Sequence, residues 1–412
     1  MPYSSGANNE VFSRISDAPE YSDLGWVTAG TMPMIAESAE SPLSARPSGV
    51  VLCFASILVM TSLGCQADGP REELEQGRII NGEDQTEHVP YFTAIFREDP
   101  NFIVHLDEKR FGCGGTLITP CHVVTAAHCL PDLDADQVTV RVGAHALDSQ
   151  LVQDPDDPSS TKVLGLMDDD NGGFPYHESD ARALHIHPDY DPEPTPGTAD
   201  IAIIELAECA PAEFDPVPMA DSESFSNFLG RIESELTVYG LGLQSVALAS
   251  EEEVEEDTLM LASTLQTADL DAKIDDEFCD LLVESYGADS QPGLICMRPL
   301  RGERTEDGPP KQATPCAGDS GSPLVFFEEE GPYFAGVHTS GVGTCGARRL
   351  LMSQSVSYHR AWLDETVCHS ALLSPIFGPW SGHSVSAESR ESLRAIVSRC
   401  QDEGILGEGE SE

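Results

Sequence analysis

The sequence predicts an all-β protein with enough chain for two β-barrels, followed by a helix near the carboxyl terminus. Short apolar or alternating runs recur along the chain, and glycine-, proline- and aspartate-rich segments separate them, which is typical of strands joined by turns. The clearest runs are Tyr91–Phe96, Gln137–Val142, Ile201–Leu206, Leu324–Phe327 and Tyr333–His338. No internal repeat or separate binding module is evident.

The segment after Cys368 carries the helical pattern. Ser386 can cap the first turn and Gly404 can end the last one. The apolar residues that fall on one face are Leu393, Ile396, Val397 and Cys400. A helix packed through this face is therefore expected in the carboxyl-terminal extension.

Three short motifs supply the side chains of nucleophilic catalysis. Ser320 lies in the glycine-flanked stretch CAGDSGSP, His128 lies in TAAHC, and Asp200 opens the apolar run DIAII. A serine hydroxyl needs a base to take its proton, and a buried carboxylate holds that base in the right tautomer. Alone, each fragment would indicate a turn or core packing. Together, in the order His, Asp, Ser, they predict a catalytic triad.

The glycine two residues before Ser320 has a chemical reason as well. It lets the chain turn so that the N–H groups of Gly318 and Ser320 point at one spot. Backbone donors in that arrangement stabilise the oxyanion of acyl transfer.

These motifs resemble the trypsin/chymotrypsin family of serine proteases, and the resemblance extends well beyond the triad. It covers about residues 79 to 370 and implies two six-stranded antiparallel barrels with a closing helix. The further matching motifs are RIING (Arg78–Gly82), FGCGGTLI (Phe111–Ile118), HPDY (His187–Tyr190), TVYGLG (Thr237–Gly242) and SYHRAWL (Ser357–Leu363).

The resemblance implies a zymogen. In the family, cleavage after the residue that matches Arg78 frees an Ile79 amine, which pairs with the aspartate before the nucleophile, here Asp319. A buried carboxylate without a partner is costly, so the loop that carries the oxyanion donors should be poorly ordered before cleavage.

Twelve cysteines in 412 residues indicate an oxidising, extracytoplasmic environment. The resemblance implies the pairs Cys113–Cys129, Cys279–Cys296 and Cys316–Cys345. Cys53 and Cys65 belong to a leader, which leaves four cysteines and three ways to pair them. We favour Cys121–Cys209, which each follow a strand near a triad residue, and Cys368–Cys400, which flank the extension.

The amino-terminal region has the pattern of an export signal. An apolar stretch of about fourteen residues ends at Gly64-Cys65, which suits a signal-peptide core better than a membrane-spanning helix. SLGC (Ser62–Cys65) also resembles a bacterial lipobox, which would place a lipid anchor on Cys65 at a bacterial cell envelope; secretion is the alternative. The residues before it are long and acidic for a signal, so translation can begin later, at Met32 or Met34.

We accordingly divide the chain into five parts: a leader (1–48), a signal peptide or lipoprotein signal (49–65), an activation propeptide (66–78), a protease domain (79–370) and an extension with one helix (371–412).

The formal net charge of −49 excludes nucleic-acid binding and electrostatic docking on anionic membranes. The partners expected are protein or peptide substrates and an activating protease, and the protein is expected to be a monomer. No cofactor is expected. The run Asp168–Gly173 hints at calcium, but it fails the EF-hand template and favours a solvated loop.

The predicted substrate pocket departs from that of trypsin. Its floor, six residues before the nucleophile, is Thr314 rather than an aspartate, so cleavage after Lys or Arg is not expected. One wall reads Thr339-Ser340-Gly341, and His338 before it resembles the pocket histidine of glutamate-specific endopeptidases. A histidine can donate hydrogen bonds to a substrate carboxylate. The alternative is a core histidine, with a preference of the enzyme for medium-sized residues.

Two other functions share parts of this sequence pattern. A catalytically silent binding or scaffold protein would normally have lost a triad residue or the oxyanion glycine, and none is lost here. An esterase shares the acyl-transfer chemistry but would not need the Ile79 activation motif. The sequence therefore predicts a serine endopeptidase.

Overall fold

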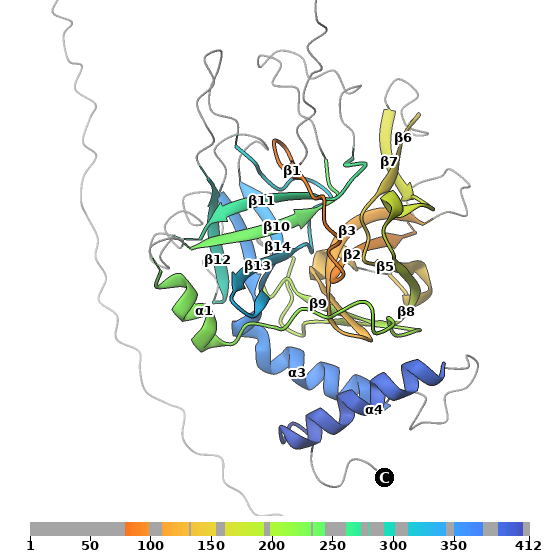
Figure 1. The fold of residues 1–412 in the computed structure, drawn as a ribbon, viewed down its shortest axis with the longest axis vertical. Helices are drawn as coiled ribbons and strands as arrows, with labels where there is room; N and C mark the ends of the chain where they lie inside the picture. Colours follow the sequence, from red (N-terminus) through yellow and green to blue (C-terminus); the bar gives the residue numbers. More distant parts are fainter. Residues whose placement is uncertain are drawn as a thin grey trace, which may run out of the picture. The chain divides into compact units, whose positions relative to one another are not determined.

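The computed structural model describes residues 79–98, 109–131, 133–153, 161–192, 198–231, 234–243, 261–272, 279, 292–300, 312–342, 350–373 and 386–406. These residues form two β-barrels and a set of helices, which Figure 1 labels and colours along the sequence. Residues 1–78, which include the predicted leader, signal and activation propeptide, lie outside these ranges. The prediction of two six-stranded antiparallel barrels with carboxyl-terminal helices is confirmed.

The first barrel is closed by antiparallel pairing in the order β2-β3-β4-β9-β8-β5. Its strands are β2 (Phe92–Arg97), β3 (Arg110–Thr119), β4 (His122–Thr125), β5 (Val138–Val142), β8 (His177–Ile186) and β9 (Ala202–Leu206). Fully buried aliphatic residues such as Ile95, Val123 and Ile203 fill its interior. Six short strands can close because inward side chains of this size fill the small lumen.

The second barrel contains β10 to β15 and is closed by pairing between β11 and β12. The short strand β1 adds to the edge of β11. The strands are β1 (Glu83–Asp84), β10 (Glu235–Gly240), β11 (Gln266–Asp271), β12 (Leu294–Pro299), β13 (Pro323–Glu328), β14 (Gly331–Val342) and β15 (Leu350–Ser355). Each of the five predicted runs falls within or overlaps a strand, and β14 is longer than expected.

A separate hairpin, which the sequence did not predict, follows the first barrel's β5. Strands β6 (Leu147–Gln153) and β7 (Thr161–Met167) pair from Leu147 opposite Met167 to Gln153 opposite Thr161. Short 3₁₀ turns occur at η1 (Ala127–Cys129), η2 (Ala135–Gln137) and η3 (Asn171–Gly173).

Three α-helices complete the described part of the chain: α1 (Ser222–Leu229), α3 (Val356–Leu373) and α4 (Ala387–Asp402). Helix α3 begins directly after β15 and runs past the domain boundary placed at residue 370. Helix α4 starts as the sequence indicates, because the Ser386 side chain accepts a hydrogen bond from the Ser389 N–H. Its end matches as well: Gly404 has a φ of 73°.

Helix α4 packs on the protein through its predicted face. Leu393, Ile396, Val397 and Cys400 are all buried. The N–H of Cys209 donates to the hydroxyl of Ser389, with 2.9 Å between the two atoms. The extension is therefore attached to the first barrel by packing and polar contacts.

Between described residues, the structure shows four expected disulfides: Cys113–Cys129, Cys121–Cys209, Cys279–Cys296 and Cys368–Cys400. Cys316 is also disulfide-bonded, but its expected partner, Cys345, lies outside the described residues. Cys368–Cys400 joins α3 to α4 and so ties the extension to the closing helix.

Within the described ranges, no helix has the length and apolar character needed to cross a membrane.

Candidate active site

The loop before β13 carries Ser320 between two glycines in left-handed conformations. Gly318 has a φ of 93° and Gly321 a φ of 81°. A Cβ atom on Gly318 would lie 2.9 Å from the Gly242 Cα, and one on Gly321 would lie 2.2 Å from the Thr125 Oγ1. Only glycine suits both the backbone angles and the close approach. The spacing read from the sequence therefore serves a tight turn around Ser320.

This loop packs against the strands that lead to His128. The Gly114 N–H donates to the Ser320 carbonyl at 2.8 Å, and the Thr125 hydroxyl donates to the Gly114 carbonyl at the same distance. Thr125 ends β4 and lies three residues before His128. The second barrel thus places Ser320 at the end of the first barrel that carries the His128 turn, η1 (Ala127–Cys129).

His128 and Asp200 form a close pair. Because β4 pairs antiparallel with β9, with Thr125 opposite Ala202, the residues that follow one strand and precede the other meet at one edge. One Asp200 carboxylate oxygen accepts from the His128 N–H at 2.8 Å, and the other lies 2.7 Å from the His128 Nδ1. Asp200 is buried, whereas 37% of the His128 side chain is exposed. This geometry places the Nδ1 proton toward Asp200 and leaves Nε2 as the basic nitrogen.

The Ser320 hydroxyl points to a different acceptor. Its Oγ lies 3.5 Å from the Thr339 carbonyl oxygen, and no hydrogen bond joins it to His128 among the described residues. Such contacts are often long in unliganded proteins and tighten when substrate binds. The structure therefore brings the three predicted triad residues to one edge without closing the bond from serine to histidine.

The predicted oxyanion donors are Gly318 and Ser320. In the described part of the chain, neither of these two N–H groups donates to a backbone or side-chain acceptor.

Asp319 is fully buried behind the nucleophile. One of its carboxylate oxygens accepts from the Gly242 N–H and the other from the Cys316 N–H, each at 2.8 Å. Ile79 is buried as well, whereas Arg78 lies outside the described residues. Gly242 was not singled out as a site residue by the sequence, although it ends the TVYGLG motif. A Cβ there would come within 2.6 Å of the Asp319 carboxylate, which explains the glycine.

The residues of the predicted pocket lie on β14 and just before the nucleophile loop. Thr314 is buried, and its N–H donates to the Ile80 carbonyl at 3.1 Å. His338 is only 3% exposed, and its Nδ1 lies 3.5 Å from the Ser353 hydroxyl on β15.

A β-bulge interrupts the pairing of β14 with β15 between His338 and Ser340. The hydroxyl of Thr339 donates to the Met352 carbonyl at 3.1 Å, and Gly341 pairs with Leu351. Ser353 and Met352 were missed by sequence reasoning, because only the strand register brings β15 beside the pocket wall.

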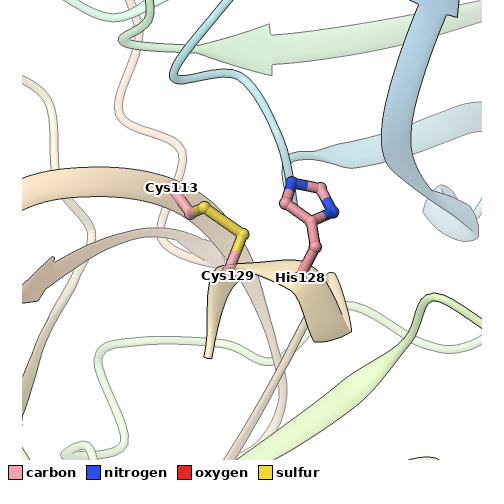
Figure 2. Close-up of side chains that lie close together, drawn as sticks. All are labelled: Cys113, His128 and Cys129. Atoms are coloured by element: carbon pink, nitrogen blue, oxygen red, sulfur yellow. A yellow bond between two sulfur atoms is a disulfide. The ribbon is translucent and has the colours of Figure 1, made fainter. Parts of the chain in front are cut away.

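One group of side chains has the composition of a metal site but is committed to another bond. Cys113, His128 and Cys129 lie together, and Figure 2 shows the two cysteine sulfurs joined in a disulfide, which removes them as ligands.

In the run Asp168–Gly173, the expectation of a solvated loop does not hold for Asn171. Its side chain is buried, accepts from the His145 N–H at 2.7 Å and donates to the Gly143 carbonyl at 3.0 Å. The Asn171 side chain therefore holds the loop against the segment after β5.

Comparisons with known proteins agree with this fold. The family model described as Trypsin matches residues 79–157. The chain is 26% identical over 301 residues to a protein named serine protease filzig from Drosophila melanogaster, a match that covers 72% of this chain and 15% of that protein. It is 24% identical to phenoloxidase-activating factor 3 from Holotrichia diomphalia, covering 83% and 86% of the two chains. It is 26% identical to a trypsin from Sarcophaga bullata, covering 75% and 97%.

Proposed function

Because the chain is a homologue of the trypsin-like serine proteases and has their chymotrypsin-like fold, we propose that it is a serine endopeptidase made as a zymogen. His128, Asp200 and Ser320 are its catalytic residues. The observation that carries the proposal is the Asp200 carboxylate, which accepts from both the backbone and the Nδ1 of His128.

The proposed mechanism follows from these contacts. Substrate binding turns the Ser320 hydroxyl from the Thr339 carbonyl toward His128, whose Nε2 takes the proton as Oγ attacks the scissile carbonyl. Asp200 stabilises the imidazolium that forms. The N–H groups of Gly318 and Ser320 stabilise the oxyanion. His128 then gives its proton to the leaving amine, and water hydrolyses the acyl-enzyme by the same steps in reverse.

The zymogen part rests on Ile79 and Asp319. Cleavage after Arg78 would free an ammonium group at Ile79, which can pair with the buried Asp319 carboxylate. Ile79 is already buried, and the neighbouring Ile80 carbonyl already bonds to Thr314 beside the proposed pocket. A short rearrangement of this segment would therefore affect both the oxyanion loop and the pocket.

For specificity we propose a preference for acidic residues on the amino side of the cleaved bond. The uncharged Thr314 offers no anion for a Lys or Arg substrate, and His338 next to the pocket wall can donate to a carboxylate. The chain's acidity acts against acidic substrates at long range. One of the relatives is named a trypsin, and none of the names reported above states an acidic preference.

The location follows from the disulfides, because trypsin-like proteins with several disulfides are typically extracellular. The relatives described above are insect proteins, so they give no support to a bacterial cell envelope. A lipid anchor at Cys65 stays a prediction.

Labelling with a fluorophosphonate after cleavage at Arg78 tests the enzyme directly. Labelling of the cut protein, and its loss in Ser320→Ala, is the expected result. A cut, folded protein that does not react would favour the binding or scaffold function instead.

Cleavage of a peptide library then tests specificity. The cut enzyme should prefer Glu or Asp, and His338→Ala should lose that preference more than it loses activity on small neutral residues. Strong cleavage after Arg or Lys would contradict the acidic preference alone.

A further inference from the structure

Three chain segments from different parts of the fold meet beside β1: the segment before β2, residues 143–147 after β5, and residues 261–266 at the start of β11. We call this meeting point the junction. The Gln85 N–H donates to the Leu265 carbonyl at 2.9 Å, the Leu265 N–H donates to the His145 carbonyl at 2.6 Å, and the Leu147 N–H donates to the Ser263 carbonyl at 3.2 Å. These backbone bonds tie the first barrel to the second.

Two histidines lie in the junction against one aromatic ring. The ring of His88 stacks on Phe174 with 5.7 Å between centroids, and the ring of His145 lies 4.1 Å from Phe174. The Nε2 of His88 and the Nδ1 of His145 are both buried, and neither has a hydrogen-bond partner among the described residues. His145 is only 3% exposed. Unpaired buried nitrogens of this kind suit a neutral imidazole and oppose a charged one.

The charged neighbours of His145 act in both directions. Burial lowers the pKa of His145 most, the charge of His88 lowers it further, and Asp84 on β1 partly opposes both. The segment 261–266 contains no titratable residue. From the loop after β7, Phe174 supplies the apolar ring and Asn171 an amide that bonds to the His145 N–H. The surroundings of the ring therefore favour its neutral form.

A series of hydrogen bonds connects the junction to the nucleophile loop. The Ala262 N–H donates to the Gly242 carbonyl at 2.9 Å, and the Gly242 N–H donates to the Asp319 carboxylate at 2.8 Å. The Leu243 N–H donates to the Ala317 carbonyl at 2.8 Å. A change in the position of residues 261–266 therefore acts on the segment that holds Asp319 and, with it, the loop of Ser320.

We propose that the junction is an acid-sensitive clasp: protonation of His145 beside His88 loosens the bonds among the three segments and relaxes the contact of Gly242 with Asp319. A protonated His145 ring has no acceptor for its buried Nδ1 among the described residues, so the cation cannot stay in this apolar site unless the segments separate or admit water. The clasp itself does not depend on catalysis. Its consequence, a reversible loss of activity in mild acid, rests on the proposed function.

The direction with pH follows from the lowered pKa of His145. The unfolded chain binds the proton below about pH 6.5, whereas the folded protein resists it. The contribution of His145 to stability is therefore complete above about pH 6.5 and is lost as the pH falls below that value.

The test uses the full chain carrying Ser320→Ala, so that proteolysis cannot interfere. Urea unfolding is measured at pH 7.5 and pH 5.0 for this parent, for His145→Phe, which keeps a ring against Phe174, and for the matched control His369→Phe on α3. We expect acid to lower the urea midpoint of the parent and the control equally, and to lower that of His145→Phe by clearly less. An equal acid shift in all three proteins would overturn the proposal.

Hydrogen exchange on the unmutated junction decides the matter even if His145→Phe does not fold. After correction for the intrinsic effect of pH on exchange, peptides that cover residues 143–147 and 261–266 should exchange at least about threefold faster at pH 5.0 than at pH 7.5. Peptides from β3 and β4 should change less. Uniform exchange across all of these peptides contradicts the clasp, whereas an inactive cut enzyme with the expected exchange contradicts only the proposed function.

Discussion

His122 and His128 lie at the two ends of one short stretch of chain, yet their surroundings differ in every respect that matters to a base. His122 opens β4 and is completely buried, with Nδ1 2.7 Å from the Thr119 hydroxyl and Nε2 3.1 Å from the Ser370 hydroxyl. His128 follows β4, keeps part of its ring exposed, and has a buried carboxylate as its partner.

The comparison shows how the partners of a histidine near a strand end decide whether its ring is suited to act as a base. Burial lowers the pKa of His122 to about 3, with further lowering by the positive charges of His185, Arg182 and Arg399. Its hydroxyl partners satisfy the ring as a neutral group but do not stabilise a cation. The Asp200 carboxylate can stabilise the cation at His128, and the exposed edge of the ring can reach a substrate. The structural role of His122 and the catalytic role proposed for His128 therefore differ because the two rings have different partners.

The largest effect is expected at the nucleophile. Ser320→Ala should lower peptide hydrolysis by at least about 10⁴-fold, because it removes the attacking oxygen and adds no bulk. The urea midpoint should stay at the parental value. Steady-state kinetics of the cut protein measures the effect, and residual activity within tenfold of the parent would sink the assignment of Ser320.

Asp200→Asn tests the carboxylate side of the comparison. The amide keeps the shape but cannot hold His128 in the same tautomer or stabilise its cation, so kcat should fall by about 10³- to 10⁴-fold near neutral pH. Activity should recover partly at higher pH, because hydroxide ion can then take the proton of the Ser320 hydroxyl. A kcat within tenfold of the parent at pH 7 would mean that His128 does not need this partner.

His122→Ala should have the opposite profile. Removing a buried ring and leaving the Thr119 and Ser370 hydroxyls unpaired should cost about 2–4 kcal/mol of unfolding free energy. The activity of each folded molecule should change little, since His122 does not touch the site. Chemical denaturation gives the first quantity and active-site titration the second. Loss of activity with unchanged stability would reverse the roles given to the two histidines.

The dependence of stability on pH gives a further test of the comparison between His122 and His128. Because the pKa of His122 is lowered in the folded protein, its stabilising contribution is complete above about pH 6.5 and declines as the pH falls toward 3, with a slope of about 1.4 kcal/mol per pH unit. His122→Gln removes the titrating group, so its stability should fall less steeply than that of the parent between pH 6 and pH 4. Parallel curves for the two proteins would show that the unfolded and folded states bind this proton equally.

Whether a feature could be predicted from the sequence depends on whether the residues that form it are close together along the chain. The nucleophile motif contains Gly318, Ser320 and Gly321 within four residues, and Ser386 directly precedes helix α4, which it caps. The turn and the cap could therefore be predicted from neighbouring residues in the sequence. The Cys368–Cys400 bridge was predictable because few cysteines remained once the family pairs were set aside. The contact between the Ser320 hydroxyl and His128 involves both barrels at once, and in the structure this hydroxyl lies against the Thr339 carbonyl instead.

The role of His122 could not be predicted for the same reason. In the sequence it is one polar letter in a strand, and its partner Ser370 lies 248 residues away on α3. Burial of Glu205 beside Arg182 and His185 similarly depends on the register of β8 and β9. The junction around His145 needs three separate segments. These features follow from tertiary packing, which one-dimensional periodicity does not record.

The smallest effect is expected at Ser370, whose hydroxyl supports His122 from α3. Ser370→Ala removes one hydrogen bond from a buried ring and should cost about 1 kcal/mol of unfolding free energy. The matched control is Ser398→Ala on the exposed side of α4, where no change is expected. If His122 depends on Ser370, combining Ser370→Ala with His122→Ala should cost less than the sum of the two single changes, because the second change finds the bond already lost. Strict additivity would mean that the hydroxyl and the ring do not interact, and that α3 rests on the barrel without a polar contact at this point.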